Sequence, residues 1–258
     1  MTRRRPPALV YGRNPVREAL LAGREVKRLL VARGVRAEPR LNEVLALARS
    51  HGAAVEEVDR KRLDDIAHSE AHQGLVAYVT RLRYWELDDL IDELQGQGSL
   101  LVVLDGVQDP QNYGSICRSA EAIGAAAVIS ASDRAPEVTP AVAKASAGAV
   151  EYLRICRVPG IAQCLLRLNG AGYWLVGLSG DADVDYLAAE YRGPCAIVVG
   201  AEGSGLHRLV RERCDQLVRL PMLGRVDSLN AGVAAAVVFY EALRQRTRAG
   251  GGAAGTAL

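Results

Sequence analysis

One stretch of the chain decides the fold. Residues 100–132 read LLVVLDGVQDPQNYGSICRSAEAIGAAAVISAS. The apolar runs at 100–104 and 126–130 each have the length of a buried strand, and the segment between them predicts a helix over 112–123. Strands joined by a helix run parallel, and a strand with no polar alternation is covered on both faces. We therefore predict a parallel sheet with helices on both sides.

The same alternation continues toward the C-terminal end. A helix is expected to open at Thr139-Pro140, another lies near Leu206, and a long final helix starts at about Asn230; further strands are expected at 153–156, 173–177, 196–199 and 217–220. Aromatic residues make up only 5% of the chain while 49% is hydrophobic, so burial depends on aliphatic side chains. This composition suits a helix-covered parallel sheet and argues against a β-sandwich. The expected fold class is α/β.

The first eighty residues predict a smaller α/β unit. Its first helix is expected to begin at Pro15 with Asn14 as the cap. Further strands and helices are expected at 28–31, 41–51, 53–58, 60–67 and 74–79. After residue 80 the pattern weakens and ends in the polar segment QGQGS, which is typical of a linker. We predict an N-terminal domain at 1–80, a linker at 81–99, a second domain at 100–248 and a disordered tail at 249–258.

Charge is concentrated at the N-terminal end. Residues 1–40 hold ten arginines and one lysine against three glutamates, although the formal net charge of the whole chain is only +2. Such a basic segment suggests a polyanionic partner. A solvated, arginine-rich surface without a partner is an equally good explanation of charge alone.

Composition also argues against several classes of protein. No uncharged stretch reaches the roughly 18 to 20 apolar residues that a membrane span needs, and no apolar run follows the N-terminal arginines as it would in a secretory signal. The five cysteines are odd in number and lack metal-ligand spacing, so we expect neither a disulfide framework nor structural zinc. The expected protein is cytoplasmic, with reduced, mostly buried thiols and with no metal and no membrane partner.

Three loops that leave predicted strands carry most of the conspicuous polar residues. They read DPQNYGSICR at 109–118, VVGAEGSGL at 198–206 and LPMLGRVDSLN at 220–230. Ligands of parallel sheets bind beyond the carboxyl ends of the strands, where such loops lie. Taken singly, each feature has a structural explanation: Asn112 and Asn230 could be plain helix caps, and Arg118 could pair along its helix. His207 is expected to be an exposed helix residue.

Taken together, in this order and spacing, the three motifs resemble those of the TrmH/SpoU family of S-adenosylmethionine-dependent RNA ribose 2′-O-methyltransferases. YGRNPV at 11–16 and HQG at 72–74 are similar to the N-terminal substrate-binding domain of one branch of that family. That branch methylates a guanosine of large-subunit ribosomal RNA. The resemblance covers nearly the whole chain apart from its ends.

The resemblance implies a cofactor site and an assembly. In the family the C-terminal domain forms a deep trefoil knot that houses S-adenosylmethionine, and two knotted domains pack together as a homodimer. The cofactor contacts map to Gly200, Leu220 and Leu229, and the loop leaving another strand adds Leu178 and Gly180. No metal is required, because the sulfonium is already a good leaving group.

The resemblance also implies roles in catalysis for five residues. Arg118 is the leading candidate to act on the ribose hydroxyl, Asn112 and Glu202 shape the site, and Ser228 and Asn230 help to hold substrate or loop. A guanidinium stays protonated, so we expect Arg118 to bind phosphate and to stabilise the developing alkoxide instead of acting as a base.

The third motif departs from the commonest family pattern. Asp227 stands where a second serine is frequent, and Ala231-Gly232 follow Asn230. The SLN core at 228–230 is kept. The departure therefore affects fine contacts with substrate more than the cofactor site.

Alternatives remain for the function and for the surface of the last helix. Within the enzyme class, the substrate could be a transfer RNA or another ribosomal guanosine, although the N-terminal domain favours ribosomal RNA. A different class is a non-catalytic RNA-binding or ribosome-assembly factor, against which the five retained polar residues argue. Val233, Val237, Tyr240 and Leu243 recur at helical spacing and predict a dimer surface, with internal core as the alternative.

Overall fold

The protein is described here by a computed structural model that covers residues 7–133 and 135–249. Contacts divide the chain into two compact units. Of the described residues, the first unit comprises 7–83 with 137–152, and the second comprises 84–133, 135–136 and 153–249. The expected tail, apart from residue 249, and the run of arginines at the N-terminus lie outside the described residues.

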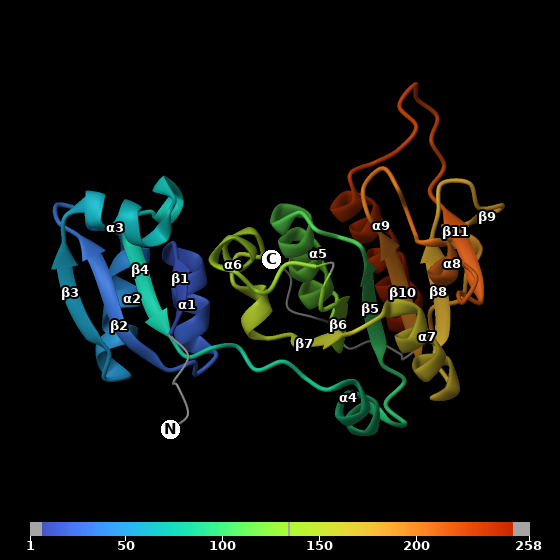
Figure 1. The fold of residues 1–258 in the computed structure, drawn as a ribbon, viewed down its shortest axis with the longest axis horizontal. Helices are drawn as coiled ribbons and strands as arrows, with labels where there is room; N and C mark the ends of the chain where they lie inside the picture. Colours follow the sequence, from blue (N-terminus) through green and yellow to red (C-terminus); the bar gives the residue numbers. More distant parts are fainter. Residues whose placement is uncertain (1–6, 134, 250–258) are drawn as a thin grey trace. The chain divides into compact units, whose positions relative to one another are not determined.

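The first unit is built on a four-stranded sheet in the order β1-β4-β2-β3 (Figure 1). Strand β4 is antiparallel to β1 and to β2, and β2 is parallel to β3. The strands are β1 (Ala8–Tyr11), β2 (Val26–Ala32), β3 (Ala54–Val58) and β4 (Leu75–Val79). Strand β1 was not among the sequence expectations. It has only four residues, and its pairing partner β4 lies far along the chain.

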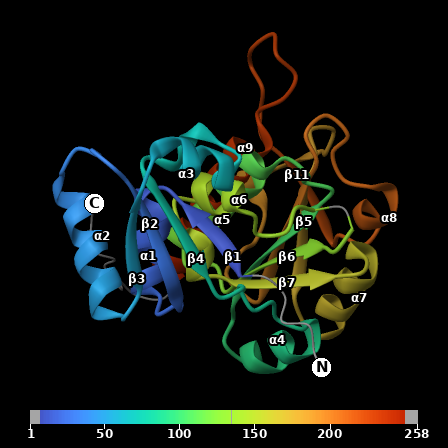
Figure 2. The ribbon, with the colours of Figure 1, turned by 60° about the vertical axis from the view of Figure 1, so that its left-hand side comes forward.

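Helices cover both faces of this sheet (Figure 2). They are α1 (Arg13–Leu21), α2 (Pro39–Ser50), α3 (Arg60–Ala67) and the short 3-10 helix η1 (Glu70–His72). Successive residues of a strand point to opposite faces. Accordingly, Leu29 packs in the core formed with α1 and α2, whereas Leu30 packs with Leu63 of α3. This arrangement confirms a small N-terminal α/β unit.

Helix α1 begins two residues before the predicted start. Its N-cap is Gly12, which has φ 93°, and not Asn14. Pro15 therefore lies within the first turn, where the missing N–H costs no intrahelical hydrogen bond. Gly12 also donates its N–H to the carbonyl of Leu75 at 3.1 Å, which ties the start of the helix to β4.

Residues 137–152 belong to the first unit by their contacts, although they lie between two strands of the second unit in the chain. They contain α6 (Pro140–Ala145) and the 3-10 helix η2 (Ala149–Glu151). Lys144 donates from Nζ to the carbonyl of Ala71 at 2.7 Å, and Arg24 pairs with the buried Glu151 at 2.6 Å. The sequence predicts this segment as part of the second domain at 100–248. Local pattern identifies its helix but not the sheet on which the helix packs.

The second unit is built on a seven-stranded sheet in the order β7-β6-β5-β10-β8-β11-β9. All of its strand pairs are parallel, which confirms the predicted sheet. The strands are β5 (Leu100–Asp105), β6 (Ala127–Ala131), β7 (Arg154–Val158), β8 (Trp174–Leu178), β9 (Val184–Asp185), β10 (Cys195–Gly200) and β11 (Gln216–Arg219).

Two groups of helices pack on this sheet (Figure 1). One group is α4 (Leu87–Leu94), α7 (Ile161–Gly170) and α8 (Arg208–Arg211), which share a buried core with alternate strand residues such as Val103. The other group is α5 (Pro110–Ala122) and α9 (Ala231–Ala249), which pack against each other and against β6 and β10. A short 3-10 helix, η3 (Tyr186–Ala188), follows β9. Val102 and Leu104, which alternate with Val103, are also fully buried, so both faces are covered.

Helix α4 corrects the expectation of a linker at 81–99. Leu90 and Leu94 are buried in the same core as α7, and the N–H of Trp85 bonds the carbonyl of Ile155 at 2.8 Å. The sequence LDDLIDEL places leucines three and four residues apart, which is the pattern of one buried helix face. That pattern was the available signal, and the flanking polar and glycine residues obscured it.

The strands that carry the three motifs end at one edge of the sheet. Strand β5 ends at Asp105, whose neighbour in the register is Gly200 at the end of β10. The neighbouring strands β8 and β11 end at Leu178 and Arg219. The loops singled out in the sequence therefore converge, as the rule for ligand sites of parallel sheets requires. Strand order does not test the expected trefoil knot, which stays a prediction.

Two further expectations concern the membrane and the thiols. Among the helices of the described residues, none has the length and hydrophobicity that crossing a bilayer demands. Four of the five cysteines are buried and Cys214 is half-buried, as expected. Burial raises the pKa of the Cys156 thiol to about 12, so this group is not a nucleophile at neutral pH.

Candidate active site

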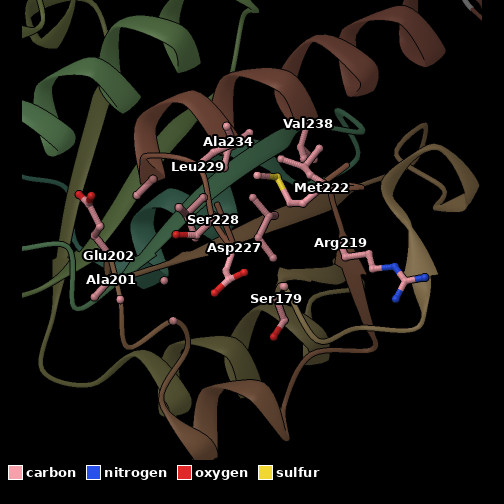
Figure 3. Close-up of a pocket in the computed structure, with 18 of the residues that line it drawn as sticks. Ser179, Ala201, Glu202, Arg219, Met222, Asp227, Ser228, Leu229, Ala234 and Val238 are labelled. Atoms are coloured by element: carbon pink, nitrogen blue, oxygen red, sulfur yellow. The ribbon is translucent and has the colours of Figure 1, made fainter. Parts of the chain in front are cut away.

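A cavity of about 380 Å³ lies at the converging loops. We call it the first cavity (Figure 3). Its walls come from the loops that leave β8, β10 and β11 and from the first turns of α9. In Figure 3 the side chains of Ala234 and Val238 extend from α9 toward the cavity, and Glu202 and Ala201 lie together at one side of it.

The first cavity brings together all five residues expected to contact the cofactor. Its lining includes Leu178, Gly180, Gly200, Leu220 and Leu229. The same cavity is lined by Ser228 and Glu202 from the expected catalytic set. The geometry therefore assembles these positions at one place, and their roles stay predictions.

Gly200 is a glycine for a reason that the sequence did not supply. A Cβ atom at this position would lie 2.3 Å from the carbonyl carbon of Gly205 and 2.6 Å from the backbone nitrogen of Leu206. The missing side chain thus lets the β10–α8 loop fold back on its own strand. The resemblance implies only that Gly200 contacts the cofactor.

Three motif residues from distant parts of the chain form one hydrogen-bonded cluster. Asn112 Nδ2 donates to Glu202 Oε2 at 2.8 Å, and Asn230 Nδ2 donates to Asn112 Oδ1 at 2.7 Å. Asn230 Nδ2 also lies 3.5 Å from Glu202 Oε2. Because each motif supplies one member, the cluster fixes the three loops against one another.

The hydrogen bonds also show whether each of the two asparagines is a helix cap or a member of the polar cluster. Helix α5 is capped by Asp109, whose Oδ2 accepts from the N–H of Asn112 at 3.0 Å, so Asn112 is not the cap. Asn230 does act as a cap, because its Oδ1 accepts from the N–H of Gly232 at 3.0 Å. Its amide nitrogen remains available to the cluster. Gly232 has to be small here, since a Cβ atom would lie 2.2 Å from Ser115 Oγ of α5.

Arg118 is not brought to this cluster. It is exposed on α5 and lines neither the first cavity nor the second cavity described next. Within the part of the chain that the structure describes, Arg118 makes no side-chain hydrogen bond and no ion pair. Its guanidinium is therefore open to a partner that approaches from outside.

A second cavity of about 480 Å³ adjoins the first. It is formed by the loop between β5 and α5 and by the loop between β10 and α8, and its lining residues are Gly106, Val107, Gln108, Asp109, Asn112, Ala201, Glu202, Ser204 and His207. Ala201 and Glu202 line both cavities. They form the wall where the two spaces meet.

A carboxylate–imidazole pair that the sequence did not predict lies at the second cavity, where His207 is a lining residue and Asp105 is buried behind it. Asp105 is 4% exposed, and its two oxygens accept from the backbone N–H of His207 at 2.7 Å and from His207 Nδ1 at 2.9 Å. The histidine stands immediately before α8 and was expected to be an exposed helix residue. Two signals for this pair were available in the sequence. His207 follows the glycine-containing loop at 200–205, and Asp105 is a polar residue at the end of an apolar strand.

A second polar network supports the first cavity from the side. Arg211 Nη1 donates to Asp181 Oδ1 and to Ser179 Oγ, both at 2.7 Å. Ser179 Oγ in turn donates to Asp181 Oδ1 at 2.5 Å, and the hydrogen bonds from Arg211 and then from Ser179 lower the pKa of Asp181 to about 2. The network holds the loop that carries Ser179 and Gly180. The sequence did not predict this network, because Arg211 lies outside the three motifs.

The charged groups of the first cavity are mostly acidic. Glu202 and Asp227 carry carboxylates, and Arg219 carries the opposing charge. In Figure 3, Asp227 projects into the cavity while the guanidinium of Arg219 lies at its outer side. Within the described ranges, no three His, Cys, Asp or Glu side chains are grouped as a metal site would need.

Two family models match successive parts of the chain. Residues 99–240 match the SpoU rRNA Methylase family, and residues 9–85 match the model named RNA 2′-O ribose methyltransferase substrate binding. The first match contains all three motifs. The second contains the YGRNPV and HQG segments.

Individual proteins are similar over nearly the full length. A 23S rRNA (guanosine-2′-O-)-methyltransferase of Vibrio cholerae is 44% identical over 241 residues, which are 92% of this chain and 93% of that protein. The crystal structure of the SpoU methyltransferase AviRb from Streptomyces viridochromogenes has a TM-score of 0.78 at 29% identity and covers 95% of this chain and 91% of its own. An AdoMet-bound rRNA methyltransferase from Sinorhizobium meliloti has a TM-score of 0.76 at 28% identity and covers 93% and 87%.

Proposed function

This chain belongs to the SpoU rRNA methylase family, and from that premise we propose that it transfers a methyl group from S-adenosylmethionine to the ribose 2′-hydroxyl of a guanosine in 23S ribosomal RNA. The first unit would bind the RNA and the second would carry out the transfer. The guanosine and the ribosomal RNA rest on the similarity to the Vibrio cholerae enzyme.

One observation carries the proposal beyond family membership. The Asn112–Glu202–Asn230 cluster lies where the two cavities meet, because Glu202 lines both of them and Asn112 lines the second. A group transfer needs two reactants held on either side of one point. A wall of fixed polar side chains between two cavities meets that requirement.

The residues of the first cavity fit S-adenosylmethionine. Leu178, Leu229 and Val238 supply apolar walls for an adenosine, and the backbone at Gly200 and Leu220 supplies hydrogen-bonding groups. The carboxylates of Glu202 and Asp227 suit a ligand with a sulfonium and an ammonium group. When bound, this cofactor supplies a methyl group on a positively charged sulfur that a ribose oxygen attacks.

The chain's own residues would position the acceptor and stabilise charge. Glu202 is fixed by the amide of Asn112 and is held at the shared wall, while Ser228 borders the first cavity. Arg118 cannot serve as a simple base, because a guanidinium keeps its protons. We assign it to the RNA phosphate and the developing alkoxide, with its open guanidinium meeting RNA from outside the cavities.

Assembly and location follow as further proposals. We propose a homodimer that uses the outer face of α9. Val233, Val237 and Tyr240 are 51%, 37% and 56% exposed there, at positions that share one helix face. Leu243 is half-buried and contributes less. A cytoplasmic location follows from a ribosomal RNA substrate.

The deciding experiment supplies unmodified 23S ribosomal RNA, 16S ribosomal RNA and total transfer RNA in parallel with S-adenosylmethionine labelled in its methyl group. Label is expected in 23S RNA alone, in a guanosine whose 3′ phosphodiester bond resists alkaline hydrolysis. Label in transfer RNA would favour the other substrate class of this family. Tight RNA binding without any transfer would favour a ribosome-assembly factor.

A further inference from the structure

The second cavity offers hydrogen-bond acceptors more than positive charge. Among the described residues that line it there is no lysine and no arginine, while Asp109 and Glu202 bring carboxylates. His207, the remaining titratable lining residue, is bonded through Nδ1 to the buried Asp105. A phosphate group is therefore disfavoured in this space, and a neutral group that carries N–H donors is favoured.

The shared wall decides how a nucleotide would lie in this cavity. If the cofactor occupies the first cavity, as the proposed function on which this inference rests requires, the acceptor ribose has to reach Ala201 and Glu202 from the second cavity. The volume of the second cavity, about 480 Å³, is within the range of small-molecule pockets. A base attached to that ribose therefore extends into the part of the second cavity that the first cavity does not share.

Asp109 borders that part of the second cavity. It lines the second cavity and not the first. Its Oδ2 accepts from the N–H of Asn112 at 3.0 Å and so caps α5. Within the part of the chain that the structure describes, its Oδ1 makes no hydrogen bond, and the residue is exposed. One oxygen thus fixes the carboxylate, and the other is open to a ligand.

The base that best complements a carboxylate is guanine. Its Watson–Crick edge carries N1–H and the N2 amino group, two donors side by side, and a carboxylate accepts such a pair with its two oxygens. Oδ2 keeps a second lone pair for this contact, since the cap uses only one. Adenine and cytosine present one amino group beside an acceptor nitrogen, and uracil presents one N–H between two carbonyls. These acceptors are repelled by a carboxylate.

We propose that Asp109 determines the base specificity of the chain, because its carboxylate accepts from N1–H and N2–H of a guanine held in the second cavity while the ribose of that nucleotide lies at the shared wall. Asp109 is thus a residue that recognises the acceptor base. It selects the nucleotide that reaches the wall and has no contact with the cofactor.

The first experiment detects the contact without methyl transfer. Kethoxal reacts with N1 and N2 of unpaired guanines, so it probes the edge that Asp109 would cover. A 23S ribosomal RNA transcript is treated with kethoxal in complex with the full chain, with S-adenosylhomocysteine in place of the methyl donor. The wild type is expected to protect one unpaired guanosine. Asp109→Asn keeps a capping side chain for α5 but turns an amide toward the two donors, so it should leave this guanosine reactive.

The second experiment removes the N2 amino group from the acceptor. A synthetic 23S fragment carries guanosine or inosine at the protected position, and inosine differs from guanosine only in lacking that group. The wild type should transfer methyl to inosine about tenfold more slowly in a single turnover, as expected for one lost contact to a charged group. Asp109→Asn should be about tenfold slower on guanosine and should treat the two RNAs alike within about twofold.

Calorimetry with S-adenosylmethionine and thermal melting accompany each variant, and both are expected to be unchanged. Asp185→Asn is the matched control, because Asp185 caps η3 by accepting from the N–H of Leu187 at 2.9 Å and lines neither cavity. It should protect the guanosine and discriminate against inosine as the wild type does.

The outcomes separate the base contact from the proposed reaction. Equal discrimination against inosine by Asp109→Asn and the wild type would overturn the inference and leave the proposed function intact. Methyl transfer by a wild type that protects no guanosine would do the same. A guanosine whose protection depends on Asp109, without any methyl transfer, would support the inference and reject the proposed function.

Discussion

The first and second cavities meet at Ala201 and Glu202 but are lined by different kinds of chemical groups. The first is lined largely by aliphatic side chains and by backbone at glycines, on loops that are mostly exposed. The second is lined by polar side chains that hydrogen bonds already fix, among them Asn112, Glu202 and His207. A cofactor that is the same in every turnover can be held by shape and backbone. A macromolecular acceptor has to be placed by directed polar groups, because the reacting oxygen is one of many alike.

The largest effect should come from the backbone that shapes the first cavity. Gly200→Val drives a branched side chain into Gly205 and Leu206, so the β10–α8 loop has to move. We expect S-adenosylmethionine affinity to fall at least about a thousandfold by calorimetry. Gly193→Val is the control, since no atom lies within 4 Å of a Cβ built there. Retained cofactor binding in Gly200→Val would show that the loop closes around the cofactor by another route.

Arg118→Ala should separate cofactor binding from methyl transfer to the acceptor most clearly. The side chain is exposed and outside both cavities, so fold and cofactor binding should be unchanged. Methyl transfer should fall about a hundredfold, the effect of removing one group that stabilises developing charge. Arg167→Ala, an exposed arginine of α7, serves for comparison. Turnover within about threefold of the wild type, which is only roughly 0.7 kcal/mol in barrier, would contradict the assigned role.

Asn112→Ala tests whether the polar cluster serves the acceptor alone. It removes the hydrogen bonds to Glu202 and Asn230, and single-turnover methyl transfer should fall about tenfold, as expected for one misplaced buried polar contact. Cofactor affinity should stay within about threefold. Asn169→Ala, which breaks an exposed contact with Asp215, should leave both quantities unchanged. A parallel loss of cofactor affinity would mean that the cluster also supports the first cavity.

The smallest effect is expected from the apolar wall. Leu229 is 40% exposed and lines the first cavity, so Leu229→Ala removes about 1 kcal/mol of apolar contact and weakens cofactor binding roughly fivefold. Leu223 lies in the same loop but is 100% exposed and outside the cavity, so Leu223→Ala should have no effect. Equal effects of the two variants in calorimetry would indicate a loop that closes as a whole.

Much of the second unit could be predicted from the sequence because its strands are short, apolar and separated by helices. The motifs sit at strand ends, so their convergence followed from the parallel sheet. The Asp105–His207 pair could not be predicted, because it joins residues that are far apart in the chain and depends on the register of β5 and β10. The close contact between Gly200 and Gly205 could not be predicted either, since only the folded loop brings the two residues together. Arg118 shows the opposite case, in which a motif residue lies outside the cavities that its neighbours line.

Because residues 137–152 belong to the first unit, they affect the order in which the two units can fold during synthesis. The first unit is not a continuous piece of chain, since its last part follows β6 of the second unit. On the ribosome, the contact between Arg24 and Glu151 cannot form until residue 151 has been made, by which time β5 and β6 are already present. The sheet around β5 and β6 is also incomplete at that point, because β10, which pairs with β5, is made later still. The two units therefore complete their folding in an interleaved order, and a truncation after residue 83 would leave the first unit without its last part.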